Sequence, residues 1–182
     1  QEVICEGHGH IYNYEMASMS AIGGVLPRVV ETDRGIMTWE QIELAITPRT
    51  KAIMPVHLTG RPAKMDRIME IAKAHGLIVV EDAAQAVGAS YKGRRVGAMG
   101  DAGCFSLHPL KNLHAFGDGG MMVTNDEALY DRILMLRNHG LKSRDQCDFW
   151  SYNCRLDEMQ AAHVGTQRLG DHLAVQAADA RA

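Results

Sequence analysis

Apolar positions along this chain fall into short runs that alternate with stretches of helical spacing. Residues 50–56 form a short apolar run, and residues 63–75 then carry apolar side chains at helical spacing before Gly76, a residue typical of helix ends. Residues 77–80 follow as an unbroken, mostly β-branched run, as expected of a parallel strand buried on both faces. The pattern predicts a strand, a helix and a parallel strand joined by a right-handed crossover.

The same alternation continues on both sides of this unit. Upstream, we expect strands at 3–5 and 26–30 and helices at 14–22 and 38–45, the last opened by a Thr38–Gln41 capping box. Downstream, we expect strands at 102–107 and 121–124 and a helix at 126–138. The fold class is therefore α/β, with no linker long enough to separate two domains.

The composition is that of an ordinary globular protein. Of 182 residues, 46% are hydrophobic and 23% are charged, and 19 Lys and Arg against 22 Asp and Glu give a net charge of −3. This balance argues against a nucleic-acid partner, and no apolar run approaches the ~20 residues of a membrane helix. Four cysteines without a C-x-x-C pair predict reduced thiols, so we expect a cytoplasmic protein.

Both ends of the chain lack the usual signals of a terminus. The first residue is Gln1, a strand pattern begins at once, and residues 169–182 form an alanine-rich, helix-like run without a cap. We therefore expect this chain to be part of a longer protein.

Common catalytic motifs are absent: the sequence contains no G-x-G-x-x-G, no P-loop, no G-x-S-x-G and no H-E-x-x-H. Polar residues instead gather where the predicted strands end. Glu81 and Asp82 follow the run 77–80, while Ser106 and Lys111 lie at and after the end of the next strand. Because ligands of open α/β sheets bind just outside the carboxyl ends of the strands, we expect these side chains at one site.

A carboxylate, a lysine and hydroxyl or amide donors in one crevice are the groups that pyridoxal phosphate (PLP) requires. The lysine amine binds the cofactor, the carboxylate keeps the pyridine nitrogen protonated, and the donors hold the phenolic oxygen and the phosphate. The spacing alone leaves a second interpretation open, because a carboxylate after a strand often caps a turn and a loop lysine is often solvated.

Seven segments of the chain occur in the order typical of one enzyme family. They are residues 46–53 (ITPRTKAI), 55–58 (PVHL), 81–86 (EDAAQA), 105–113 (FSLHPLKNL), 117–120 (GDGG), 137–140 (RNHG) and 152–162 (YNCRLDEMQAA). Together they resemble the DegT/StrS family of sugar aminotransferases, members of fold type I of the PLP-dependent enzymes. The resemblance implies that residues 1–182 are a PLP-binding large domain, three-layered with a mostly parallel sheet. The N-terminal phosphate loop and C-terminal small domain of the family are missing from this chain.

The resemblance implies a role for each polar residue at the strand ends. Lys111 would bind PLP covalently and act as the catalytic base and acid, and Asp82 would pair with the pyridine nitrogen. Gln85 would contact the phenolic oxygen, and Ser106 the phosphate. Asn153 would contact the phosphate of the cofactor held by a neighbouring subunit, so a homodimer with shared active sites is expected.

Near the start of the chain, residues 2–5 (EVIC) are followed by residues 10–15 (HIYNYE). On these segments, residues 3–46 resemble a different fold type I group, the threonine aldolases. Both groups place here the residue that stacks on the pyridine ring, usually an aromatic residue in the sugar enzymes and a histidine in the aldolases. His10 is therefore the expected stacking residue.

The resemblance implies transfer of an amino group from glutamate or glutamine to the keto group of a nucleotide-linked sugar. Relatives in which histidine replaces the lysine dehydrate deoxysugars, so Lys111 favours transamination. Two alternatives stay open. Residues 3–46 favour an aldolase or lyase acting on a β-hydroxy amino acid, and the missing ends favour a truncated, non-catalytic relative.

Other histidines have less specific interpretations. His8 and His10 alternate in a way that could orient both toward a metal ion, but no third ligand is evident and we expect no metal site. His57 and His108 flank predicted strand ends and are candidates for substrate contact, with a structural role as the alternative.

Overall fold

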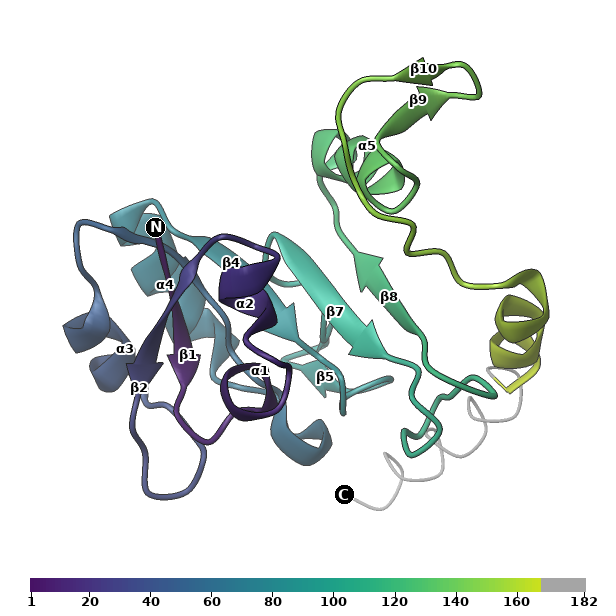
Figure 1. The fold of residues 1–182 in the computed structure, drawn as a ribbon. Helices are drawn as coiled ribbons and strands as arrows, with labels where there is room; N and C mark the ends of the chain where they lie inside the picture. Colours follow the sequence, from purple (N-terminus) through teal and green to yellow (C-terminus); the bar gives the residue numbers. More distant parts are fainter. Residues whose placement is uncertain (168–182) are drawn as a thin grey trace. The chain divides into compact units, whose positions relative to one another are not determined.

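A computed structural model describes residues 1–167 of the chain (Figure 1), which fall into two compact units, Gln1–Phe105 and a second that begins at Ser106. In the first unit, strands lie side by side in the order β2-β1-β3-β4-β7, and every pairing between them is parallel. They are β1 (Glu2–Glu6), β2 (Leu26–Val30), β3 (Thr50–Ile53), β4 (Ile78–Asp82) and β7 (Ala102–Ser106). The predicted α/β class with a parallel sheet is confirmed.

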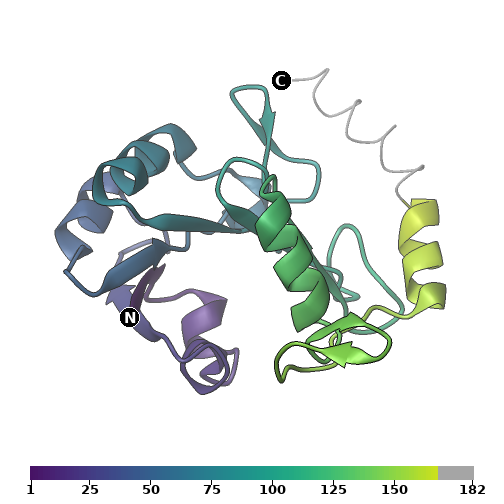
Figure 2. The same ribbon diagram turned by 90° about the horizontal axis from the view of Figure 1, so that it is seen from above.

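Helices cover both faces of this sheet. Helices α3 (Trp39–Ala45) and α4 (Met65–His75) lie on one face, and the short helices α1 (His10–Asn13) and α2 (Ser18–Ala21) lie on the other (Figures 1 and 2). Ile4 of β1 packs with the core beneath α3 and α4, whereas its neighbours Val3 and Cys5 pack with Met19 of α2. Successive strand residues point to opposite faces, so one strand supplies both cores and the unit has three layers.

The predicted helix boundaries hold where the local signals are strong. Thr38 and Gln41 form the expected capping box at the start of α3, and Gly76 ends α4 in the left-handed conformation, with φ 62°. The expected helix over residues 14–22 is wrong: α1 ends at Asn13, and α2 begins only at Ser18. The Asn13 side chain donates to the carbonyls of Gly7 and Gly9, which ties the end of α1 back to the preceding loop.

Strand β4 carries the two carboxylates that the sequence placed after it. Glu81 and Asp82 are its last residues, and the alternation of the strand turns their side chains to opposite faces. Val79 is fully buried, but Ile78 is 52% exposed, so the expectation that this run is buried on both faces along its whole length is wrong. The sequence had indicated only apolar character, which does not distinguish the start of the strand from its centre.

The second unit contains β8 (Gly120–Val123), α5 (Glu127–Leu136) and a hairpin of β9 (Leu141–Ser143) with β10 (Gln146–Cys147). Asp126 caps α5 by accepting from the Leu129 N–H. Residues 158–167 are also helical. No helix within residues 1–167 has both the length and the hydropathy to cross a bilayer. The assignment of residues 1–182 to one cofactor-binding domain stays a prediction.

Candidate active site

Asp82 is held by backbone hydrogen bonds at the carboxyl end of β4. Its N–H donates to the Pro55 carbonyl, and its carbonyl accepts from the His57 N–H, both at 2.9 Å. On the other side, Asp82 pairs in register with Cys104 of β7. Its side-chain Oδ1 accepts from the Ala84 N–H at 3.1 Å, and Oδ2 has no hydrogen-bond partner among residues 1–167. The carboxylate is half-buried and oriented, with one oxygen left for a ligand.

Gln85 is oriented by the loop that follows β3. Its Oε1 accepts from the Thr59 N–H at 2.9 Å, within the 3-10 turn Leu58–Gly60. Thr59 has φ 53°, a left-handed conformation that is strained for a β-branched residue. Because Oε1 already accepts, the amide N–H groups of Gln85 are the atoms left to meet a ligand, and they are donors. The first unit therefore brings Asp82 and Gln85 together beside one loop.

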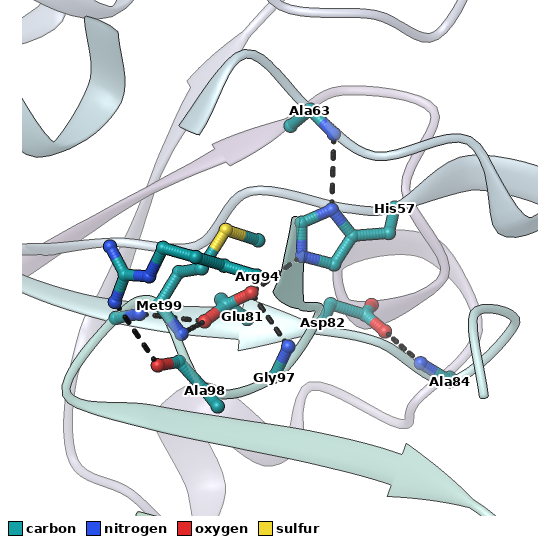
Figure 3. Close-up of polar contacts among 10 residues, drawn as sticks. His57, Ala63, Glu81, Asp82, Ala84, Arg94, Gly97, Ala98 and Met99 are labelled. Atoms are coloured by element: carbon teal, nitrogen blue, oxygen red, sulfur yellow. Dashed lines mark hydrogen bonds and ion pairs between the residues drawn. The ribbon is translucent and has the colours of Figure 1, made fainter. Parts of the chain in front are cut away.

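Glu81, the neighbour of Asp82, forms a buried network that the sequence did not reveal (Figure 3). Glu81 Oε2 lies 2.9 Å from His57 Nε2 and 2.8 Å from the Gly97 nitrogen. Its Oε1 lies 2.7 Å from the Met99 nitrogen and 2.6 Å from the Gly100 nitrogen. The side chains of Glu81 and His57 are completely buried. The alternative that His57 contacts substrate does not fit this burial.

The hydrogen bonds around Glu81 stabilise it as a carboxylate. Burial is the largest influence and raises its pKa, but the hydrogen bonds from His57, Gly100, Gly97 and Met99 together outweigh it, so the pKa of Glu81 lies below its usual value. A signal for this network was present in the sequence as a carboxylate inside the end of an apolar strand, but its partners are 16 to 24 residues away.

His10 lies just beyond the carboxyl end of β1, at the same edge of the sheet as Asp82. It begins α1, and its side chain is 69% exposed. The ring packs against Tyr14, with centroids 4.7 Å apart, and Nδ1 lies 3.5 Å from Glu15 Oε1. His8 instead directs Nε2 to the Thr32 carbonyl. No group of three or more possible metal ligands occurs in the described part of the chain.

Ser106 and Lys111 lie on one tight turn at the start of the second unit. Ser106 Oγ accepts from the His108 N–H at 3.2 Å, and the Lys111 N–H donates to the His108 carbonyl at 2.9 Å. Leu107 anchors the turn, because it is fully buried and bonds through its backbone to Gly119 and Ala115. His108 Nδ1 accepts from the Leu110 N–H, so this histidine organises the turn. The second unit therefore brings Ser106 and Lys111 together.

Asn153 lies on a segment that is pinned to the end of α5. It forms a β-bridge with Asn138, flanked by hydrogen bonds from the His139 N–H to the Tyr152 carbonyl and from the Cys154 N–H to the Arg137 carbonyl. The Asn153 residue itself is exposed. Its backbone is fixed while its amide faces outward, which suits a contact with a separate molecule.

A comparison with known protein families decides what this arrangement belongs to. The model of the DegT/DnrJ/EryC1/StrS aminotransferase family matches residues 2–178. The chain belongs to this family. The match confirms the resemblance found in the seven segments and also covers residues 3–46.

Individual relatives agree with this membership. The chain is 55% identical over 140 residues to a UDP-N-acetyl-3-dehydro-alpha-D-glucosamine 3-aminotransferase of Acidithiobacillus ferrooxidans, covering 76% of this chain and 38% of the relative. The crystal structure of DesV from S. venezuelae, in complex with a ketimine intermediate, superimposes with TM-score 0.84 at 46% identity, covering 93% of this chain and 45% of DesV. The structure of NtdA from Bacillus subtilis with bound cofactor PMP has TM-score 0.79 at 29% identity, covering 92% and 38%.

These comparisons confirm the fold type I, α/β architecture of the chain. The chain spans less than half the length of each of these relatives. The cofactor roles of the polar residues at the strand ends remain what the family resemblance implies.

Proposed function

We propose that the intact protein is a PLP-dependent aminotransferase that moves an amino group from glutamate or glutamine to the keto group of a nucleotide-linked sugar. The observation that carries this proposal is the pair Asp82 and Gln85, each oriented by a backbone hydrogen bond, with one Asp82 carboxylate oxygen and the Gln85 amide N–H groups left for a ligand. Family membership supports the reaction class. The UDP-linked sugar in the name of the Acidithiobacillus relative supports the substrate class.

The residues of this chain fit PLP by the chemistry of their donors and acceptors. A protonated pyridine nitrogen needs an anionic acceptor, and Asp82 keeps Oδ2 available for it. A negatively charged phenolic oxygen needs a donor, and the Gln85 amide offers its N–H groups. Ser106 Oγ already accepts from a backbone N–H, so its hydroxyl proton can point to a phosphate oxygen. Each group therefore has the polarity that its ligand atom requires.

When bound, PLP would supply an electron sink for the charge that develops at carbon as a proton is removed. Lys111 would hold the cofactor and then move that proton as base and acid through its Nζ atom. Asp82 would keep the ring nitrogen protonated, and His10 would give a flat, polarisable surface on the ring face. Asn153 would reach the cofactor phosphate of a second subunit, which makes the active form a homodimer.

The cysteines support a reducing, cytoplasmic location for the protein. Within residues 1–167, Cys5, Cys104, Cys147 and Cys154 are all free thiols. Structural disulfides are typical of oxidising compartments, whereas unpaired cysteines are typical of the cytosol. Nucleic acid and membrane are not among the partners we propose.

The test is to reduce the intact, PLP-loaded protein with borohydride and map the labelled peptide. We expect the label on Lys111, and loss of the visible cofactor band in Lys111→Arg but not in the matched control Lys51→Arg. A label on another lysine would overturn the site, and absence of any label would favour a non-catalytic relative. Cleavage of threonine to glycine and acetaldehyde would favour the aldolase alternative.

A further inference from the structure

The network around Glu81 ties the loop after β3 and the segment before β7 to the end of β4. Residues 97–100 donate three backbone N–H groups to the Glu81 carboxylate, and His57, in the loop after β3, supplies a fourth partner (Figure 3). Burying a carboxylate is unfavourable unless its oxygens are hydrogen-bonded, and here both oxygens have two partners. Glu81 therefore acts as a fixed anchor on β4, one residue before Asp82.

The geometry decides which nitrogen of His57 carries the proton. The Ala63 N–H points to Nδ1 at 3.0 Å, and a backbone N–H is only a donor, so Nδ1 must be the acceptor. Nε2 then carries the hydrogen and donates it to Glu81 Oε2. One imidazole thus closes the loop between residues 57 and 63 and joins it to the strand end.

This same loop carries the two contacts that orient the candidate cofactor residues. The His57 N–H donates to the Asp82 carbonyl, and the Thr59 N–H, two residues further, donates to Gln85. Thr59 keeps its left-handed conformation although that conformation is strained for threonine, so surrounding contacts must hold it there. Within this loop, the His57 ring two residues before Thr59 makes two buried or half-buried contacts, to Glu81 and to the Ala63 N–H.

We propose that the buried His57–Glu81 pair is a positioning element that sets the Asp82 carboxylate and the Gln85 amide against the cofactor ring. The pair touches neither cofactor nor substrate and acts through the loop 57–63 and through β4. This inference rests on the proposed function, since it assumes that Asp82 and Gln85 face PLP. A side chain that must be held within about 0.5 Å of its productive position needs supporting residues whose own positions are fixed by packing and hydrogen bonds.

Substitutions of His57 separate its two hydrogen bonds. His57→Gln can keep an N–H at the place of Nε2 and so keep the bond to Glu81, whereas His57→Asn can keep an acceptor for Ala63 but falls short of Glu81. The matched control is Glu70→Gln, an exposed carboxylate-to-amide change on α4 outside the network. Each variant of the intact protein is first checked for folding by circular dichroism.

The decisive measurement is the NMR shift of an isotopically labelled pyridine nitrogen in bound PLP, which reports its protonation, together with the Kd for PLP. We expect His57→Asn to move the shift toward the unprotonated value and to weaken PLP binding about tenfold. His57→Gln should keep the NMR shift and the Kd for PLP close to the wild-type values, and Glu70→Gln should match the wild type in both. A role in stability alone would lower the melting temperature and leave the shift unchanged.

The outcomes separate this inference from the proposed function. If the wild type binds no PLP at Lys111, the proposed function fails. If the wild type binds PLP and folded His57→Asn has the wild-type shift and Kd, the positioning role is overturned. Failure of both His57 variants to fold would assign the pair to folding and would overturn the positioning role as well.

Discussion

Asp82 Oδ1 accepts the Ala84 N–H at 3.1 Å, so one oxygen of this carboxylate is used within the chain. An asparagine at this position has an oxygen that can accept the same hydrogen bond. In place of the second carboxylate oxygen, asparagine has an NH₂ group, which cannot accept a hydrogen bond from a protonated pyridine nitrogen. The substitution Asp82→Asn therefore separates the two interpretations of Asp82, as a turn cap and as the partner of a cofactor.

We expect Asp82→Asn to lower turnover by orders of magnitude while PLP stays bound. The turn is kept because the bond to Ala84 is kept, but the ring nitrogen loses its charged partner and the ring becomes a weaker electron sink. The measurement is the rate of the half reaction with glutamate or glutamine. Asp66→Asn, on α4, serves as the matched control. A near-normal rate combined with earlier melting would leave Asp82 as a turn cap.

His10→Phe distinguishes a transaminase from an aldolase. Stacking on a cofactor ring needs only a flat, polarisable face, so the half reaction should stay within about tenfold of the wild type, a barrier change of about 1.4 kcal/mol. An aldolase would also need the imidazole to engage the β-hydroxyl of its substrate, and it would lose far more. Stopped-flow spectra of cofactor conversion give the rate. Ready cleavage of threonine that His10→Phe abolishes would replace the transaminase interpretation.

Asn153 tests whether active sites are shared between subunits. We expect Asn153→Ala to weaken PLP binding, because an exposed amide on a pinned segment would no longer reach the neighbouring cofactor phosphate. Mixing Asn153→Ala with Lys111→Ala should form heterodimers with one intact site and restore part of the activity. Asn13 does not offer a neutral asparagine-to-alanine control, because its side chain donates to the carbonyls of Gly7 and Gly9 and so holds the end of α1. Heterodimers that form but stay inactive would contradict sharing.

The stability contributed by Glu81 should depend on pH. Its pKa in the folded protein lies below the unfolded value of 4.5, because hydrogen bonds to the carboxylate outweigh burial. The contribution is therefore complete above that value and is lost as the pH falls through the folded pKa. We expect Glu81→Gln to lose about 3 kcal/mol in unfolding free energy near neutral pH, because an NH₂ group cannot accept the backbone N–H groups that the carboxylate oxygen accepts. The difference from wild type should narrow in acid. Urea unfolding of both proteins from neutral to acid pH measures this difference in unfolding free energy. A difference that does not change with pH would contradict a lowered pKa of Glu81.

Local physical chemistry was enough to identify much of the first unit from the sequence. The capping box at Thr38 and the left-handed Gly76 depend on residues within one or two turns of a helix, so their neighbours in sequence specify them. Strand β2 also has the predicted bounds, Leu26–Val30, because its own residues specify it. The place of Asp82 at a strand end, and so at the edge where such sheets bind ligands, also follows from the apolar run before it.

Only the tertiary structure decided what the residues beside Asp82 do. Glu81 and Asp82 are adjacent carboxylates in the sequence, yet one is buried against His57 and three backbone N–H groups while the other keeps an oxygen available. Gln85 owes its orientation to Thr59, 26 residues earlier in the chain. These bonds join loops that meet only when parallel strands pair, and their geometry depends on the whole sheet. A sequence pattern specifies which groups are polar, but the packing of distant segments determines which of them meet.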